Sequence, residues 1–207
     1  MSKRVVVVDY GVGNLHSVTK ALLHQGATVS VTADGEEIER ASHVVLPGVG
    51  AFEDCRREFH ARGLAAPITR YIAAGRPLLG ICVGAQLLMS ESEEFGRHEG
   101  LGVIPGRVVR IPSAGVKVPH VGWNSLRPPS GTFEGTILES VGASDMVYFV
   151  HSYAPVPEDP AHWLAETRYG TIRFASAIRR DNALGVQFHP EKSGETGLRI
   201  IASFLAL

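Results

Sequence analysis

The sequence predicts an α/β protein: a single domain, residues 1–207, with a mostly parallel central sheet flanked by helices and an antiparallel strand extension in its second half. In the first half, short β-branched runs alternate with segments of helical periodicity, the pattern of parallel strands joined by helices. In the second half, short strands follow one another with turn residues between them. The length of 207 residues and the hydrophobic content of 44% suit one domain with a large core.

The first half supplies the strands and helices of the expected parallel sheet. Residues 3–10, KRVVVVDY, form a continuous β-branched run, which is typical of a strand covered on both faces. Residues 14–26 have apolar side chains at helical spacing and end at Gly26, a favourable residue at a helix C-terminus. The same alternation predicts further strands at 27–33, 42–48 and 77–81, and further helices at 51–63, 64–75 and 83–91.

The second half changes from alternating elements to consecutive strands. Six strand-like segments are separated by glycine, proline and other turn residues, which favours antiparallel pairing. The expected strands are residues 107–111, 119–126, 146–155, 162–170, 171–180 and 183–189. An amphipathic helix at residues 194–207 follows them.

Composition argues against several classes of function. Twenty basic and 21 acidic side chains nearly cancel, so neither a nucleic-acid surface nor a membrane surface is expected. No apolar run is long enough to span a bilayer, and the N-terminal run stops at Asp9. Two cysteines, Cys55 and Cys82, argue against a disulfide framework and for a reducing, cytoplasmic location. No close-spaced cluster of histidine and cysteine suggests a metal, and no cofactor is expected.

The segment GICVG, residues 80–84, has the form Gly-x-nucleophile-x-Gly. Glycine at both flanks permits a tight turn from strand to helix, because a Cβ there would collide with a neighbouring element. The turn would raise Cys82 above the carboxyl edge of the sheet. It would also place the sulfur at the start of the helix expected at 83–91, whose free amides favour a thiolate over a thiol. Most free cysteines are small buried hydrophobes, and Cys55, in a charged helical stretch, is interpreted that way.

A thiolate nucleophile needs a proton shuttle and a group that orients it. Near the C-terminus, GVQFHPEKS places His189 and Glu191 on one side at strand spacing, and Pro190 turns the chain between them. Taken alone, a His-Pro-Glu sequence more often marks the capped end of a strand than a catalytic site. Together with the segment at 80–84, it predicts a Cys-His-Glu triad.

The loop after the third expected strand, LPGVGAF at residues 46–52, could supply amides to the same site. An oxyanion hole needs two such donors. One would be the amide of Val83, and the other that of Val49 or Gly50. The Gly-x-Gly at residues 11–13 also follows a strand, but His16 stands where a dinucleotide site would have its third glycine, so we reject that interpretation.

Several of these segments resemble the class I (triad) glutamine amidotransferases. Gly-Ile-Cys-Val-Gly-Ala-Gln at residues 80–86 and His-Pro-Glu at 189–191 carry the resemblance. Within that class, the resemblance is to glutaminase subunits of imidazole glycerol phosphate synthases, and it runs from residue 5 to the C-terminal helix. The segments that narrow it are DYGVGN at 9–14, PGVG at 47–50, PHVGWN at 119–124, YFVHSY at 148–153 and QFHPEKS at 187–193. Val83 and Ala85 depart from the leucine and methionine that are usual in the family.

The resemblance implies glutamine as the substrate and assigns roles to individual residues. Cys82 would attack the side-chain amide of glutamine, and His189, oriented by Glu191, would move the protons. Glutamine would be bound by Gly50, Gln86, Val150, His151 and Ser152, partly through backbone atoms. For His151, fixing a loop is as plausible a role as touching the ligand.

The resemblance also implies a partner. Ammonia released into neutral water becomes ammonium and is no longer a nucleophile, so it must pass directly into an acceptor protein. In the family the acceptor protein is a (β/α)₈-barrel cyclase. It converts PRFAR, a ribulosyl aminoimidazole-carboxamide nucleotide, to imidazole glycerol phosphate and the ribonucleotide AICAR. The two subunits would form a heterodimer. The candidates for its docking face and ammonia gate are Asn14, Trp123, Tyr148 and Lys192. The Cβ of Val49, where the class generally has glycine, would disfavour turning its amide into the site until the partner docks.

Three alternatives remain at the level of the sequence. The chain could be the glutaminase subunit of another triad amidotransferase, although PGVG, GWN and VHSY argue against it. A cysteine hydrolase or peptidase could share the same turn at Cys82. A binding module without catalysis is the third possibility, which an intact triad disfavours.

Overall fold

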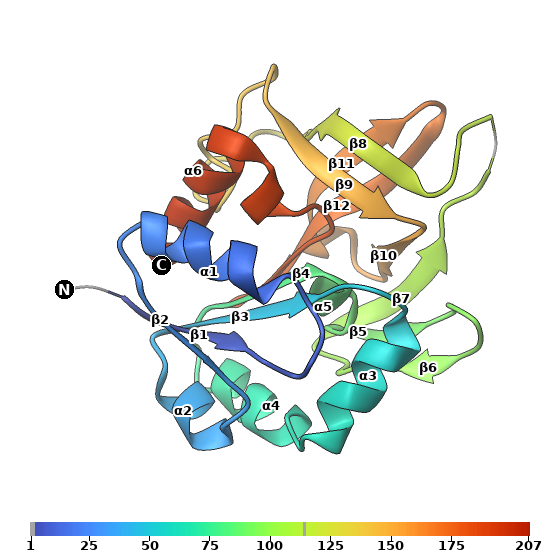
Figure 1. Cartoon of the computed structure of the whole chain (residues 1–207). Helices are drawn as coiled ribbons and strands as arrows, with labels where there is room; N and C mark the ends of the chain where they lie inside the picture. The colour runs from blue at the N-terminus through green and yellow to red at the C-terminus, as the bar shows by residue number, and fades with distance from the viewer. Residues whose placement is uncertain (1–2, 114) are drawn as a thin grey trace.

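The structure is a computed structural model that describes residues 3–113 and 115–207 (Figure 1). Its centre is a seven-stranded sheet with the order β11-β12-β13-β4-β3-β1-β2. Five strands are parallel: β1 (Arg4–Val8), β2 (Thr28–Thr32), β3 (His43–Gly48), β4 (Leu78–Cys82) and β13 (Ala183–Val186). The last two, β12 (Ile172–Arg180) and β11 (Trp163–Tyr169), continue the sheet antiparallel. The predicted fold class is therefore confirmed.

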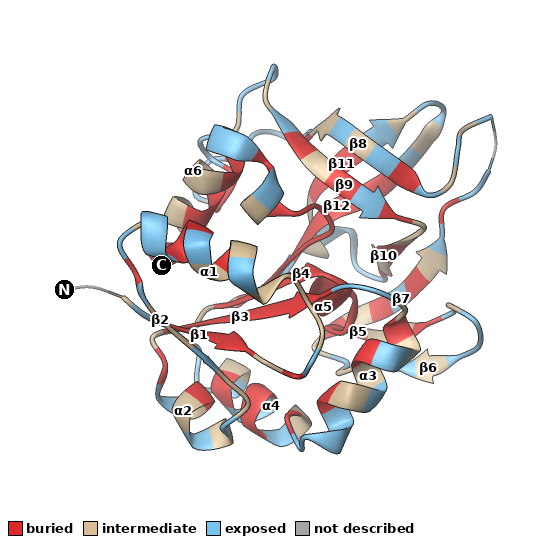
Figure 2. Cartoon of the chain, viewed as in Figure 1, coloured by how far each residue is buried: buried red, intermediate tan, exposed pale blue. Residues whose placement is uncertain are grey.

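Helices cover both faces of the parallel part of this sheet (Figure 1). On one face lie α1 (Leu15–His24) and α6 (Gly194–Leu205), and on the other lie α2 (Gly35–Arg40), α3 (Phe52–Ala61) and α4 (Ala65–Ala73). Because both faces are covered, the central strands are buried along nearly their whole length, as Figure 2 shows for β1, β3 and β4. The β-branched run of the first strand thus forms part of the core, as its composition predicts.

Residues 89–157 add two smaller sheets to the central one. One has the order β10-β7-β5-β6 and the other pairs β8 with β9. Their strands are β5 (Met89–Ser92), β6 (His98–Glu99), β7 (Ile104–Arg110), β8 (His120–Ser125), β9 (Met146–His151) and β10 (Tyr153–Pro157). Two short 3₁₀ helices, η1 (Pro160–His162) and η2 (Pro190–Lys192), complete the described chain. Most of these pairs are antiparallel, so the predicted extension is present.

The structure corrects three predicted elements. The helix expected at 83–91 is only four residues long, α5 (Val83–Gln86). Leu87 and Leu88 are buried after it, and Met89 begins β5 by pairing with Ile104 of β7. The strand expected at 146–155 breaks at Ser152 and joins two different sheets. Helix α2 was missed; its signal is Asp34, whose side chain accepts a hydrogen bond of 2.8 Å from the Glu36 amide at the helix start.

Across the described residues, no helix combines the length and the apolar character that crossing a membrane requires.

Candidate active site

Cys82 is the last residue of β4 and stands at the sharp turn into α5. Its backbone has φ +55° and ψ −113°, in a region that non-glycine residues rarely adopt. A Cβ built on Gly80 would lie 2.6 Å from the Gly84 carbonyl oxygen, and one on Gly84 would lie 1.8 Å from the Leu46 carbonyl oxygen. Both flanking glycines are therefore required by backbone packing, and the strain at Cys82 is held by these close approaches.

Helix α5 is too short to act on Cys82 as the longer helix expected at 83–91 would. A macrodipole accumulates along a helix, so four residues supply little of the field expected from a helix at 83–91. Support for a thiolate at Cys82 must come mainly from neighbouring side chains.

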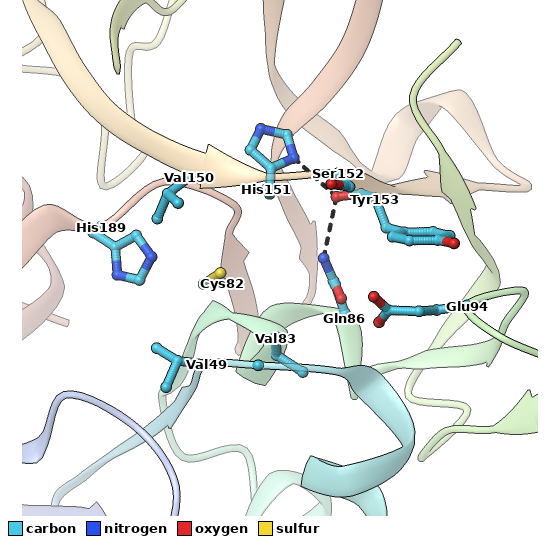
Figure 3. A pocket seen from close by; sticks show the side chains of 11 residues that line it. Val49, Cys82, Val83, Gln86, Glu94, Val150, His151, Ser152, Tyr153 and His189 are labelled. Carbon is cyan, nitrogen blue, oxygen red and sulfur yellow. Dashed lines mark hydrogen bonds between the residues drawn. The ribbon is translucent and has the colours of Figure 1, made fainter. Parts of the chain in front are cut away.

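His189 and Glu191 form a buried pair beside Cys82. Nδ1 of His189 lies 2.9 Å from Oε1 of Glu191, and the two side chains are 2% and 1% exposed. The pair is positioned by β13, which runs parallel to β4, and by η2, whose first turn contains Glu191. The other ring nitrogen, Nε2, has no aligned hydrogen bond to a described residue, and Figure 3 shows the imidazole facing the sulfur of Cys82.

The surroundings of His189 favour its protonated form. Burial by itself would lower the pKa of this histidine, but the neighbouring Cys82 and the hydrogen-bonded Glu191, each negative when ionised, outweigh it. The net effect raises the pKa of His189 to about 9. An imidazolium between a thiolate and a carboxylate is the charge arrangement that a Cys-His-Glu triad uses before reaction.

This shift predicts a pH dependence of stability. The folded protein holds a proton on His189 that the unfolded chain releases near pH 6.5, so the stabilisation is complete below that pH and is lost as pH rises through about 9. We expect the free energy of unfolding, measured with urea, to fall over this interval more steeply for the wild type than for His189→Gln. In Cys82→Ala, which lacks one of the two raising partners, the fall should be smaller. Equal slopes in all three proteins would contradict the charge assignment.

A pair of buried glutamines joins the far end of the pocket to Cys82. Nε2 of Gln86 donates to the Tyr153 carbonyl oxygen at 3.2 Å and to Oε1 of Gln187 at 2.9 Å. Nε2 of Gln187 in turn donates to Sγ of Cys82 at 3.6 Å. This last contact places the partial positive charge of the N–H group beside the sulfur. Sequence reasoning gave Gln187 no role, although strand alternation puts it two residues before His189 on the same side.

A cavity of about 180 Å³ opens over the sulfur of Cys82 (Figure 3). Every residue expected in the oxyanion hole or around glutamine lines it, together with Cys82, His189 and two residues that the sequence did not indicate. The lining residues are Val49, Gly50, Cys82, Val83, Gln86, Glu94, Val150, His151, Ser152, Tyr153 and His189. The break between β9 and β10 at Ser152 is what brings residues 150–153 to this cavity.

Glu94 and Tyr153 are the two cavity-lining residues that sequence reasoning missed. Oε2 of Glu94 accepts a hydrogen bond of 2.7 Å from the Phe52 amide at the start of α3, and Figure 3 shows its carboxylate at the edge of the cavity. Glu94 is the one acidic residue among the described lining residues. It lies in a run of glutamates and serines at 90–94, so the sequence offers no signal that separates it from solvated neighbours.

The side chain of His151 fixes the loop. Its Nδ1 lies 2.9 Å from the Tyr153 carbonyl oxygen, and its ring packs edge-on against Phe174 with centroids 5.0 Å apart. Burial lowers the pKa of His151 to about 3, so the ring is neutral and Nδ1 is the donor. Of the two roles expected for His151, loop fixation is the one this geometry favours.

The amide of Val49 does not face Cys82 in this conformation. The Val44 amide donates to the Pro77 oxygen at 3.1 Å, so alternate residues of β3 from Val44 onward direct their backbone groups toward β4. Gly48, which pairs with Cys82 at the end of this ladder, follows the same alternation, and its carbonyl therefore points toward β4. The carbonyls on either side point the other way, where Oη of Tyr10 donates to the Pro47 oxygen at 2.5 Å and Sγ of Cys55 donates to the Val49 oxygen at 3.3 Å. In a trans peptide the Val49 N–H is opposite the Gly48 carbonyl, and so is turned away from the sulfur.

None of the four residues expected at a docking face is among the described residues that line the cavity. Trp123 is 54% exposed on β8, and its ring is T-shaped against Tyr148 of β9 with centroids 5.9 Å apart. The Tyr148 carbonyl accepts from the His189 amide at 2.9 Å, which ties this sheet to the triad. Lys192 is exposed in η2, and Asn14 is half-buried before α1.

No group of three or more potential metal-ligating side chains occurs within residues 3–113 and 115–207.

Comparisons with known proteins point to one family. The family described as "Glutamine amidotransferase class-I" matches residues 6–206. "Imidazole glycerol phosphate synthase subunit HisH" of Syntrophotalea carbinolica is 48% identical over 97% of this chain and 98% of its own length. The protein of the same name from Salinibacter ruber is 49% identical over 97% of this chain and 93% of its own length.

Solved structures with lower identity share the fold. The "Structure of PurLQS from Thermotoga maritima" superposes with a TM-score of 0.77 at 20% identity and covers 100% of this chain and 99% of that chain. A putative GMP synthase subunit from Thermoplasma acidophilum superposes with a TM-score of 0.69 at 20% identity, covering 100% of this chain and 94% of that one. On the family match and the identities near one half, the chain belongs to the class-I glutamine amidotransferases and, within them, to the HisH subunits of imidazole glycerol phosphate synthase.

Proposed function

We propose that this chain hydrolyses glutamine to glutamate and ammonia and delivers the ammonia to a cyclase subunit that forms imidazole glycerol phosphate in histidine biosynthesis. The observation that carries the proposal is the buried His189–Glu191 pair, 2.9 Å apart, in one cavity with a strained cysteine. The names of the relatives supply the reaction class, and the site supplies a chemistry that fits it.

In the proposed reaction, the Cys82 thiolate attacks the side-chain carbonyl carbon of glutamine. The tetrahedral oxyanion is stabilised by the amide of Val83 and by a second amide, of Val49 or Gly50, from the loop at 47–50. Collapse of this intermediate breaks the C–N bond, and the imidazolium of His189 protonates the departing nitrogen, which leaves as ammonia. The neutral imidazole then takes a proton from water, and the resulting hydroxide attacks the glutamyl thioester. The C–S bond breaks, glutamate leaves, and the thiolate of Cys82 and the imidazolium of His189 are restored for the next cycle.

The cavity also offers groups for the other end of glutamine. The carboxylate of Glu94 suits the α-ammonium group, because charge-assisted hydrogen bonds are the strong ones in a partly buried site. Backbone atoms of Gly50, Val150 and Ser152 and the side-chain oxygen of Gln86 would hold the remaining polar atoms. The imidazole of His151 acts through the loop that it fixes.

This assignment predicts a binding defect in Glu94→Gln. The amide still accepts from the Phe52 N–H but loses the charge that pairs with the α-ammonium. We expect the KM for glutamine to rise about tenfold with kcat little changed, since hydrogen bonds to charged groups contribute roughly 1.5–3 kcal/mol. Steady-state kinetics of glutamate release measures both constants. Glu93→Gln is the matched control, because Glu93 is exposed and pairs with Arg107. An unchanged KM would remove Glu94 from the glutamine site.

The partner would be a (β/α)₈-barrel cyclase in a one-to-one heterodimer. An apolar face borders the site on the two-stranded sheet, where the register pairs Val121 with Val150 and Trp123 with Tyr148. The exposed fractions of Val121, Trp123, Met146 and Val150 are 55%, 54%, 52% and 39%. Such a concentration of exposed apolar side chains beside a pocket suits a protein interface. Val150 belongs both to this face and to the cavity, so ammonia would leave Cys82 beneath the docked partner.

We also propose that the isolated subunit has a resting state with an incomplete oxyanion hole. With the Val49 amide turned away from Cys82, the oxyanion hole lacks that donor until the loop rearranges. Docking of the cyclase and its nucleotide would supply the differential contacts that favour the rearranged loop.

The test is to purify the chain with and without the cyclase of the same organism and to measure glutamate release. We expect slow release from the chain alone and fast release with cyclase plus PRFAR, accompanied by imidazole glycerol phosphate and AICAR. Equal rates in all samples would contradict the resting state. Failure of the two proteins to co-purify, or cleavage of peptides in place of glutamine, would favour another amidotransferase or a cysteine hydrolase.

A further inference from the structure

Two buried side chains outside the triad contact the loop that carries the missing oxyanion donor. Oη of Tyr10 donates to the Pro47 oxygen at 2.5 Å, and Sγ of Cys55 donates to the Val49 oxygen at 3.3 Å. Tyr10 and Cys55 are both fully buried. Neither touches the cavity over Cys82, and the proposed reaction uses neither of them.

Both donors are buried, and packing against α3 holds the Tyr10 ring. The Tyr10 ring is T-shaped against Phe59 of α3, with centroids 5.7 Å apart and an interplanar angle of 88°. Burial raises the pKa of the Tyr10 hydroxyl well above its usual value, and burial likewise raises the pKa of the Cys55 thiol to about 11, so both groups keep their protons and act as donors. A Cβ on Gly48 would lie 2.8 Å from the Tyr10 oxygen, so the loop has no room to move as a whole toward β1.

These contacts leave one peptide of the loop free to turn. The carbonyl before Gly48 and the carbonyl of Val49 are anchored, so only the Gly48–Val49 peptide can rotate between them. A half-turn with both ends fixed carries φ of Val49 into the positive region, whereas Val49 has no positive φ in the present structure. That region is strongly unfavourable for a β-branched residue, and the rotation is therefore opposed by the anchors and the Val49 side chain together.

We propose, on the basis of the function proposed above, that Cys55 and Tyr10 are positioning residues that hold the oxyanion loop in its resting conformation. If the Cys55 bond is lost, the Val49 carbonyl can move with its residue, and the amide can face Cys82 without a positive φ. These two hydrogen bonds thus keep the rate of glutamine hydrolysis low until the cyclase binds its nucleotide.

The test is a double-mutant cycle in the complex with the cyclase, assayed for glutamate release without and with PRFAR. Loss of a weak S–H donor in Cys55→Ala should raise the nucleotide-free rate about threefold and change the stimulated rate little. Cys55→Ser restores a donor and should stay at the wild-type rate. In a Val49→Gly background, where positive φ is no longer costly, Cys55→Ala should have no further effect.

A merely structural role for Cys55 predicts the opposite direction, because damage to the loop lowers the rate in both conditions. The inference is overturned if Cys55→Ala leaves the nucleotide-free rate unchanged or lowers it, if Cys55→Ser behaves like Cys55→Ala, or if the effect persists beside Val49→Gly. If Cys55→Ala does not fold, Tyr10→Phe removes the other anchor and should shift the rate in the same direction. Absence of glutamate release from the stimulated wild-type complex would instead overturn the proposed function itself.

Discussion

Replacing Cys82 with alanine should reduce glutamine-dependent turnover of the complex by on the order of 10⁴-fold or more, as loss of a catalytic nucleophile does elsewhere. Turnover supplied with ammonium salts at alkaline pH should be unchanged, because the acceptor reaction takes place in the partner. No second thiol lines the described cavity, since the Cys55 thiol is committed to the Val49 carbonyl behind the loop. Both activities are measured as imidazole glycerol phosphate formation, with glutamine or with ammonia as the nitrogen source.

Two further variants make this result specific. Cys55→Ser removes the other cysteine while keeping a donor at its position, and it should retain both activities. Cys82→Ser keeps the size and the backbone strain of position 82 but offers a far weaker nucleophile, so it should resemble Cys82→Ala in the glutamine assay. Loss of the ammonia-dependent activity in Cys82→Ala would mean that this residue maintains the complex and is not the nucleophile.

The sequence was sufficient to predict the fold class, and it indicated the three residues of the proposed triad. Continuous β-branched runs predict parallel strands covered on both faces, because a strand buried on both faces tolerates few polar side chains at any position. The glycines around Cys82 could be interpreted because their reason is steric and local: a Cβ at 80 or 84 meets backbone atoms at 2.6 Å or 1.8 Å.

What the sequence could not give depends on contacts between distant segments. The helix after Cys82 ends at Gln86 because Met89 already pairs with Ile104 in a sheet whose other strands come later in the chain, and helical periodicity cannot reveal this. Glu94 reaches the cavity because its carboxylate is fixed to the Phe52 amide, 42 positions earlier. The direction of the Val49 amide depends on a hydroxyl 37 positions from Pro47, so the residues of the loop were identifiable and its conformation was not.

The glycine at 84 gives the second large expected effect, this time on folding. Gly84→Ala would place a Cβ 1.8 Å from the Leu46 carbonyl oxygen and 2.8 Å from its carbonyl carbon. Both are backbone atoms of β3 in the middle of the sheet, so no side-chain rotation relieves the contact. Either the Cys82 turn moves away from β3 or the strand shifts, and both break the β3–β4 register on which the cavity depends.

We expect Gly84→Ala to lower the free energy of unfolding by about 4 kcal/mol or more, at the extreme of single substitutions, and to abolish alkylation of Cys82 by a glutamine analogue in any protein that still folds. Urea unfolding and mass spectrometry of the labelled protein measure the two effects. Gly142→Ala is the matched control, because a Cβ there meets only Asp145 Oδ2 at an ordinary 3.6 Å, and it should change neither quantity. Wild-type stability and labelling in Gly84→Ala would mean that the turn can relax, and that the strain at Cys82 is not imposed by its flanking glycines.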